Sequence, residues 1–165
     1  MFDKSNRPLQ GRLGDLNMSF DCEKTVLLVE DNISDVQLLR RSFHKLQITH
    51  RLVVVSDGPQ AIEYLKNTGH YSDHQKFPVP RLVLLNLHGP NVNGFEVLRR
   101  IRGNERLRSV PVIVLTGLVF PPYIKRAFAL GANSFLLKPT GIDELSDMVK
   151  ALRDHWLSPD TVAAA

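Results

Sequence analysis

Residues 80–98 have the sequence PRLVLLNLHGPNVNGFEVL, in which an apolar run ends at Asn86 and a turn-forming segment rich in Gly, Pro and Asn follows. Apolar residues then return at helical spacing from Phe95 onward. This order predicts a buried strand, a loop and a helix. In an open parallel sheet, ligands bind in the crevice at the carboxyl ends of the strands. Asn86 is therefore the first candidate site residue, although an amide here can also simply cap the strand through its own turn.

The same alternation of strand and helix occurs four more times along the chain. Strands are predicted at residues 25–29, 48–55, 112–115 and 134–137, with 52–55 as the buried part of the second. A helix with apolar residues three and four positions apart follows each strand, and the last reaches about Trp156. Five such units predict an α/β fold, a doubly wound (βα)5 parallel sheet. In the strand order 2-1-3-4-5, the first and third strands flank the topological switch point.

The chain has 165 residues, of which 43% are hydrophobic, and this suffices for one domain of ordinary size. We expect a flexible leader over residues 1–23, the folded domain over 24–156 and a short tail over 157–165. The polar connection at residues 67–80 is longer than is usual between such elements. Tyr71 and Phe77 are expected to hold it against the surface of the domain.

The formal net charge is +4, and the densest basic group is Arg99, Arg100 and Arg102. No basic stripe interleaved with aromatic residues occurs, which favours a solvated helix face over direct nucleic-acid binding. No apolar run approaches the roughly 18 residues that span a bilayer, and the N-terminus lacks the apolar core of a signal peptide. The single cysteine, Cys22, cannot form an intramolecular disulfide, which fits a reducing compartment. We therefore expect a cytoplasmic protein.

Polar side chains follow four of the predicted strands at their carboxyl ends. They are Glu30 and Asp31 after the first strand, Asn86 after the third, Thr116 after the fourth and Lys138 after the fifth. Two carboxylates suit a hard cation such as Mg²⁺, and they also suit the acidic start of a helix. A hydroxyl and an ammonium group suit the oxygens of a phosphoryl group. The sequence thus predicts a phosphoryl-binding crevice.

Several motifs in this order resemble the response-regulator receiver domain of two-component phosphorelay signalling. They are LLVEDN at residues 27–32, LLNL at 84–87 followed by Pro90 and Gly94, VLTG at 114–117 and LKP at 137–139. The resemblance covers about residues 24–156 and implies a flavodoxin-like fold and a signalling module rather than an enzyme. The long loop before the third strand and the Trp156-Leu157 end are similar to stand-alone regulators paired with bacterial phytochrome kinases.

The resemblance also implies roles for individual residues. Glu30 and Asp31 would bind Mg²⁺, residue 86 would lie at the metal site, and the backbone carbonyl of His88 would supply a further ligand. Thr116 would sense the phosphoryl group by a hydrogen bond. Lys138 would pair with that group, and its bond to Pro139 would be cis.

Further roles concern activation and assembly. Phe135 stands at the position of the aromatic switch residue, and it is also an ordinary core aromatic for a buried strand. The implied partner is a sensor histidine kinase of the phytochrome type. The implied assembly is a homodimer through the fourth helix, fifth strand and fifth helix, and the candidate residues for that face are Tyr123, Phe128, Met148 and Trp156.

Two positions depart from the family pattern. Asn86 replaces the phosphoacceptor aspartate, and an amide is a poor nucleophile because its lone pairs are delocalised. Loss of one carboxylate also weakens the attraction for Mg²⁺ while relieving repulsion between like charges. We therefore expect weak or absent metal binding and a more stable metal-free fold. Gly89 stands where an apolar residue usually precedes the proline.

The leading hypothesis is a single-domain receiver that acts by protein-protein interaction and is not phosphorylated at residue 86. Such a pseudo-receiver is either natural or the result of an engineered Asp-to-Asn change, and the retention of Glu30, Asp31, Thr116 and Lys138 keeps both readings open. The alternative is a small phosphotransfer or phosphatase-like enzyme that uses Asp31 as nucleophile. A nucleotide or flavin binder is disfavoured because no Gly-rich loop follows the first strand.

Overall fold

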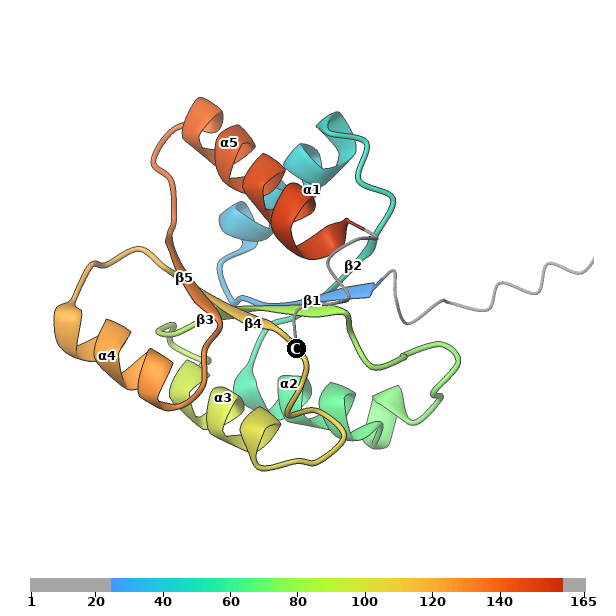
Figure 1. The fold of residues 1–165 in the computed structure, drawn as a ribbon. Helices are drawn as coiled ribbons and strands as arrows, with labels where there is room; N and C mark the ends of the chain where they lie inside the picture. Colours follow the sequence, from blue (N-terminus) through green and yellow to red (C-terminus); the bar gives the residue numbers. More distant parts are fainter. Residues whose placement is uncertain (1–24, 159–165) are drawn as a thin grey trace, which may run out of the picture.

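The computed structural model describes residues 25–158, so the predicted leader, Cys22 and residues 159–165 of the predicted tail lie outside the described residues. Five parallel strands form one sheet in the order β2-β1-β3-β4-β5 (Figure 1). The strands are β1 (Thr25–Val29), β2 (Arg51–Val55), β3 (Leu82–Asn86), β4 (Val112–Thr116) and β5 (Ser134–Leu137). The predicted fold class and strand order are confirmed.

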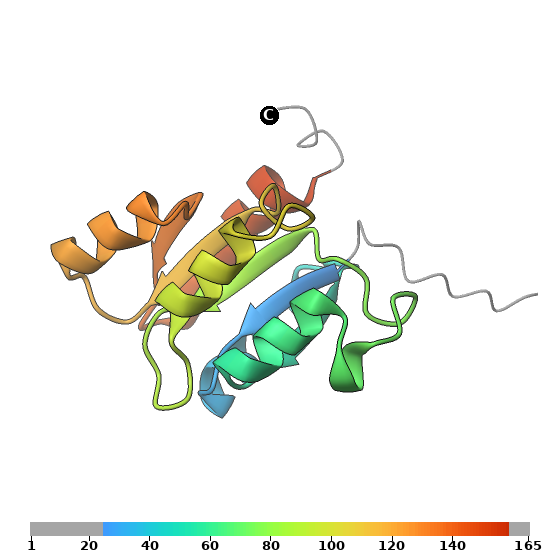
Figure 2. The same cartoon turned by 90° about the horizontal axis from the view of Figure 1, so that it is seen from below.

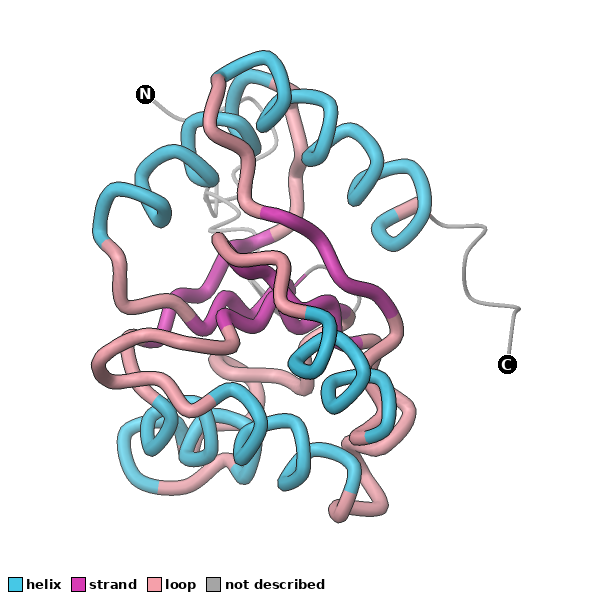
Figure 3. The backbone as a smooth tube through the Cα atoms, turned by 90° about the vertical axis from the view of Figure 1, so that its left-hand side faces the viewer, coloured by secondary structure: helices cyan, strands magenta, loops and turns pink. Residues whose placement is uncertain are grey.

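Five α-helices connect and follow the strands. They are α1 (Ile33–Lys45), α2 (Gly58–Lys66), α3 (Gly94–Arg102), α4 (Pro121–Ala129) and α5 (Ile142–Leu152). Helices α1 and α5 cover one face of the sheet, and α2, α3 and α4 cover the other (Figures 1 and 2). Figure 3 shows the sheet enclosed between these two helical layers. None of the helices in residues 25–158 is long and apolar enough to cross a membrane.

Polar residues and prolines set the helix starts. The side chain of Asn32 accepts hydrogen bonds from two backbone N–H groups of the first turn of α1, and Asp57 and Asn93 cap α2 and α3 in the same way. The pair Pro121-Pro122 begins α4, where a missing N–H group costs nothing. Helices α1 to α4 therefore each leave the carboxyl edge of the sheet at a defined residue, whereas α5 follows Gly141 without a side-chain cap.

Alternate residues of the central strands supply two separate cores. Leu27 and Val29 of β1 point into the core under α2, α3 and α4. Val26 and Leu28 point into the core under α1 and α5. Every residue of β1, β3 and β4 is buried, because these strands are covered on both faces and flanked on both sides.

The prediction that residues 52–55 are buried is wrong for most of β2. Only Val55 is fully buried, and the other four residues of the strand are partly exposed. The reason is the place of β2 at the edge of the sheet, where it pairs with β1 alone. The final helix also ends its regular part at Leu152, and a π-helical turn (Arg153–Leu157) replaces the predicted last turn.

The connection at residues 67–80 is ordered, as predicted, and it includes a 3₁₀ turn (Gly69–Tyr71). Tyr71 and Phe77 stack edge-to-face on each other and on Tyr64, with ring centroids 5.0 to 5.9 Å apart. Asn67 ends α2 in the left-handed conformation, with φ of +52°, and its Nδ2 donates to the carbonyl of Phe77 at 2.6 Å. The Tyr64 hydroxyl donates to the carbonyl of Pro78, and burial raises its pKa to about 12.

Candidate functional site

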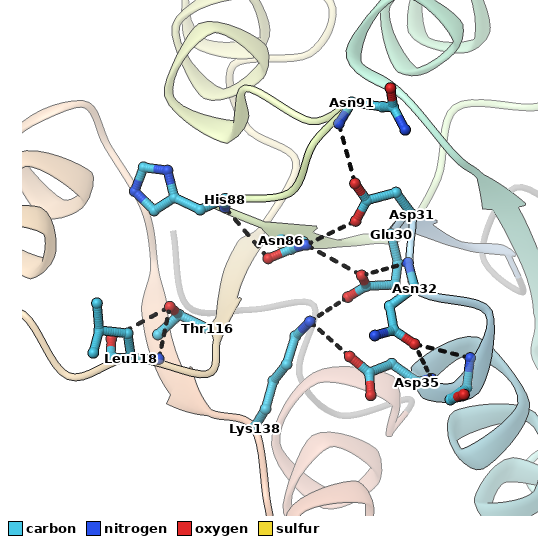
Figure 4. Close-up of polar contacts among 11 residues, drawn as sticks. Glu30, Asp31, Asn32, Asp35, Asn86, His88, Asn91, Thr116, Leu118 and Lys138 are labelled. Atoms are coloured by element: carbon cyan, nitrogen blue, oxygen red, sulfur yellow. Dashed lines mark hydrogen bonds and ion pairs between the residues drawn. The ribbon is translucent and has the colours of Figure 1, made fainter.

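Four of the predicted site residues meet at the carboxyl edge of the sheet (Figure 4). Glu30 and Asp31 follow β1, Asn86 ends β3, and Lys138 follows β5. They line a cleft of about 300 Å³ together with the loop after β3. This is the crevice that the strand order predicts.

Asn86 lies at the centre of this group and is 4% exposed. Its Nδ2 donates to Glu30 Oε1 at 3.1 Å and to Asp31 Oδ1 at 3.4 Å. Its Oδ1 accepts from the backbone N–H of His88 at 3.4 Å. The amide nitrogen therefore faces both carboxylates, and the amide oxygen points toward the loop after β3.

Glu30 is buried, and its carboxylate interacts with three polar groups. Its Oε1 accepts from Asn86 and also from the backbone N–H of Asn32 at 3.0 Å. Its Oε2 lies 2.6 Å from Lys138 Nζ, and Lys138 Nζ lies 2.8 Å from Asp35 Oδ2. Burial opposes the charge of Lys138, but the hydrogen bonds to Asp35 and Glu30 raise its pKa above the usual value. The lysine is therefore a fully charged ammonium group at neutral pH.

The part that Asp35 plays was missed from the sequence. It lies in the first turn of α1, where a carboxylate is an ordinary helix-start residue, and it is 103 positions away from Lys138 in the chain. In the structure Lys138 is shared between Glu30 and Asp35. The only available signal for Asp35 was its place at the start of α1, at the same edge of the sheet as the other candidates.

Gly89, one of the two departures from the family pattern, makes room for Asp31. A Cβ atom at residue 89 would lie 2.2 Å from both carboxylate oxygens of Asp31. The carboxylate fills this space and its Oδ2 accepts from the backbone N–H of Asn91 at 3.1 Å. Because Oδ1 accepts from Asn86, both oxygens are hydrogen-bonded, and nothing in this geometry favours Asp31 as a nucleophile.

Thr116 lies at the same edge of the sheet but is turned into its own loop. Its buried hydroxyl donates to the carbonyl of Leu118 and accepts from the N–H of the same residue, both at 3.3 Å (Figure 4). Phe135 is partly buried and packs against the core on the α4 face of the sheet. The His88 ring points away from the carboxylates and packs on Tyr123 of α4, with centroids 4.5 Å apart.

The prediction of a cis Lys138–Pro139 bond is wrong, because the described residues contain no cis peptide bond. The trans form is intrinsically favoured before proline by about 0.5–1 kcal/mol.

The arrangement does not fit Mg²⁺. A cation needs oxygen donors, and Asn86 presents its nitrogen, which has no acceptor capacity, to the two carboxylates. Within residues 25–158 no group of three or more His, Cys, Asp or Glu side chains is placed to hold a metal ion. For Asn86 to bind a metal through its oxygen, the amide would have to turn over and break its three hydrogen bonds.

The predicted residues of the dimer face do not gather in one place. Phe128 on α4 is 49% exposed, and the loop before α4 carries three further exposed apolar residues, which are Leu118, Val119 and Phe120. Tyr123 is partly buried against the core on the α4 face. Met148 and Trp156 are partly buried against the other core, under α1 and α5.

Comparison with known proteins agrees with this geometry. The family model described as the response regulator receiver domain matches residues 26–150. The probable methanogenesis regulatory protein FilR2 of Methanothrix harundinacea is 39% identical over 132 residues, which are 80% of this chain and 83% of FilR2. The response regulator Rcp1 of Synechocystis is 34% identical over 142 residues, which are 86% of this chain and 95% of Rcp1.

Solved structures are similar over the same range. The phosphorylated cyanobacterial phytochrome response regulator RcpA has a TM-score of 0.77 at 32% identity, covering 86% of this chain and 99% of its own. The Mn²⁺-bound form of Rcp1 has a TM-score of 0.75 at 33% identity, with the same coverage of both chains. The chain therefore belongs to the response-regulator receiver family of two-component signalling, and its relatives include stand-alone phytochrome response regulators.

Proposed function

We propose that this chain is a stand-alone receiver that signals by binding other proteins and is not phosphorylated at residue 86. The observation that carries the proposal is the Asn86 amide, which donates one hydrogen bond to each of two carboxylates in the middle of the crevice. The receiver family consists generally of signalling modules rather than enzymes. The proposal adds that this member has no catalytic activity of its own.

The Asn86 amide explains both the expected lack of phosphorylation and the expected weakness of metal binding. It is neutral and delocalised, so it does not attack a phosphoryl donor as a carboxylate does. Its two N–H groups supply positive partial charge to Glu30 and Asp31. A divalent cation compensates the negative charge of an acidic cluster in a similar way. Receiver domains bind Mg²⁺ or Mn²⁺ at the acidic site. In this chain we expect that binding to be weak or absent.

The exposed apolar residues around α4 support a protein-binding output. Leu118, Val119, Phe120 and Phe128 are each more than 40% exposed, and exposed apolar side chains that gather on one surface are typical of interaction sites. We propose that α4, β5 and α5 form a homodimer face centred on Phe128. Receivers of the phytochrome group partner with sensor histidine kinases and often dimerise, and the similarity to Rcp1 and RcpA supports a kinase of the phytochrome type.

The remaining parts of the proposal concern the whole chain. The proposed folded unit is residues 24–156 with a leader at 1–23, but the predicted tail at 157–165 starts too early, because Leu157 is buried in the core under α1 and α5. We propose that the protein works in the cytoplasm without direct contact to nucleic acid or membrane. Asn86 is either a natural substitution or an engineered one. The chemistry proposed for the crevice is the same in both cases.

Intact-mass analysis after incubation with acetyl phosphate and Mg²⁺ tests the absence of phosphorylation. The unmodified chain should gain no phosphoryl mass, and Asn86→Asp should gain one. A phosphoryl group on the unmodified chain contradicts the proposal. If the Asp31→Asn variant then gains no phosphoryl group, the alternative hypothesis of a phosphotransfer enzyme with Asp31 as nucleophile replaces the proposal.

Sedimentation analysis tests the dimer face. Phe128→Asp should convert a dimer to a monomer, and Ile33→Asp is the matched control, because Ile33 is 73% exposed at the start of α1 on the other face of the sheet. An unmodified chain that is monomeric, or a dimer that survives Phe128→Asp, contradicts this face.

A further inference from the structure

A second hollow lies at the end of the sheet opposite to the Asn86 crevice. Its volume is about 1,070 Å³, slightly above the range of roughly 300–1,000 Å³ that is usual for small-molecule sites. It is lined by Arg81 before β3, Arg102 at the end of α3, Arg108 before β4, and His155 and Trp156 after α5. Residues far apart in the chain thus place three guanidinium groups around one space.

The acceptors that hold two of these arginines are all neutral. Arg102 donates to the carbonyls of Gly131 and Val110 and to the side-chain oxygen of Asn133, at 2.8 to 2.9 Å. Arg81 donates to the carbonyls of Trp156 and Ser158, at 3.2 and 2.8 Å. These bonds orient the guanidinium groups, and none of these acceptors within residues 25–158 brings a negative charge to them.

Some arginines elsewhere in the described part of the chain have a carboxylate partner, whereas Arg40, Arg41, Arg106 and Arg126 have none among residues 25–158. Arg99 and Arg100 both pair with Glu96, and Arg153 pairs with Asp154. In the hollow, Arg108 is exposed, and no carboxylate lies within ion-pair distance of Arg81, Arg102 or Arg108 among residues 25–158. Burial lowers the pKa of Arg102, as expected for a cation that is partly removed from water without a counter-charge.

The wall of the hollow has a second unusual feature. His155 and Trp156 lie on the π-helical turn (Arg153–Leu157), and π-helical turns are rare in proteins and frequent at functional sites. Trp156 is partly buried, and together with Leu136 it gives the hollow an apolar side next to the arginines. Trp156 also packs against the core under α1 and α5. A hollow lined by a tryptophan and several arginines suits a ligand with a planar apolar part and a strongly charged part.

We propose that this hollow binds a small phosphorylated anion of nucleotide size, held by Arg81, Arg102 and Arg108. Guanidinium groups bind phosphate oxygens through paired hydrogen bonds, and a multiply charged phosphate matches several uncompensated cations better than a single carboxylate does. The site is separate from the Asn86 crevice and does not depend on the function proposed for that crevice. Ligand binding there would act on the ends of β3, β4 and β5 away from the crevice.

Calorimetric titration of the full chain with inorganic phosphate, pyrophosphate and ADP tests the proposal, in buffer of constant ionic strength. Trp156 is the only tryptophan, so its fluorescence gives a second, local signal. ADP should bind with one site per chain, more tightly than inorganic phosphate, and should change the tryptophan emission. Asn86→Asp should bind ADP as the unmodified chain does, which separates this site from the crevice.

Arg108→Glu is the decisive variant, because this exposed side chain has no partner among the described residues whose loss would disturb the fold. It should weaken ADP binding by at least about tenfold, the effect of losing a charge-assisted hydrogen bond. Arg106→Glu is the matched control, since Arg106 is also exposed but does not line the hollow. It should leave the affinity within about twofold.

Three results would overturn the inference. They are no saturable binding of any of the three probes at millimolar concentration, ADP affinity no higher than that of inorganic phosphate, and equal weakening by Arg106→Glu and Arg108→Glu. The last result would show that ADP is attracted by the overall positive charge of the chain and not by a specific site in the hollow.

Discussion

The replacement Asn86→Asp should lower the free energy of unfolding by about 2–4 kcal/mol at pH 7 in metal-free buffer. The amide nitrogen lies 3.1 Å from Glu30 Oε1 and 3.4 Å from Asp31 Oδ1, so the new carboxylate places a third negative charge beside two others. At an effective dielectric constant of about 20, two unit charges about 3.3 Å apart repel by roughly 5 kcal/mol. Two hydrogen bonds are lost as well.

Proton uptake sets the upper limit of this loss. Keeping a carboxyl group with an ordinary pKa of about 3.9 protonated at pH 7 costs about 4 kcal/mol, at about 1.36 kcal/mol for each pH unit. Lys138, 2.6 Å from Glu30, offsets part of the repulsion. The introduced group has a higher pKa in the folded state than in the unfolded state, so the folded state binds more protons and the loss grows as pH rises. At pH 5 the limit is about 1.5 kcal/mol.

Urea unfolding in EDTA, followed by Trp156 fluorescence at pH 5 and pH 7, measures this loss. Asn93→Asp is the matched control, because Asn93 caps α3 and aspartate and asparagine cap helices about equally well. Added Mg²⁺ should restore stability to Asn86→Asp, by about 2.7 kcal/mol at 100 times the dissociation constant, and should leave the unmodified chain unchanged. Equal or higher stability of Asn86→Asp in EDTA would refute the electrostatic reasoning.

Three further variants test other parts of the structure, each by urea unfolding. Lys138→Met should cost about 3 kcal/mol at pH 7, because it leaves the buried Glu30 carboxylate without its cation, and adding Glu30→Gln should recover most of the loss. The stability that the raised pKa of Lys138 contributes is present below its unfolded pKa of about 10.4 and is lost as pH rises through the folded value, so the unmodified chain should weaken above about pH 10.4 and Lys138→Met should weaken less. Gly94→Ala should cost about 2–3 kcal/mol, since a Cβ there would lie 2.5 Å from the carbonyl oxygen of Asn86, and a cost below 1 kcal/mol would contradict this close approach. Asn67→Ala should cost about 2 kcal/mol by removing the 2.6 Å hydrogen bond to the Phe77 carbonyl and straining a left-handed residue, whereas Asn91→Ala, at an exposed residue, should change little.

The alternation of apolar runs and helical spacing was enough to predict the fold. Each strand of the core is a short β-branched or leucine-rich run, and parallel strands joined by helices have few alternative topologies. The exposure of β2 was not predictable from its residues, because Leu52, Val53 and Val54 look as apolar as the central strands. The signal for their exposure was the predicted strand order, which places the second strand at the edge of the sheet.

The candidate site was predictable in its position and only partly in its contacts. Strand order brings Glu30, Asp31, Asn86 and Lys138 to one edge, and the structure places them together there. The partner of Lys138 was not predictable, since Asp35 comes into reach through the packing of α1 against the loop after β5. The direction of the Asn86 amide was also not predictable, because it depends on which neighbours donate and which accept.

Titration with Mg²⁺ tests most directly whether the Asn86 amide replaces a bound cation in compensating the carboxylates of the crevice. Calorimetry or amide chemical shifts of residues 30, 31 and 86 should show no saturable binding to the unmodified chain at millimolar Mg²⁺, and clear one-site binding to Asn86→Asp. Saturable binding to the unmodified chain with the dissociation constant of Asn86→Asp would contradict the account, because it would mean that the amide turns its oxygen to the metal at no measurable cost.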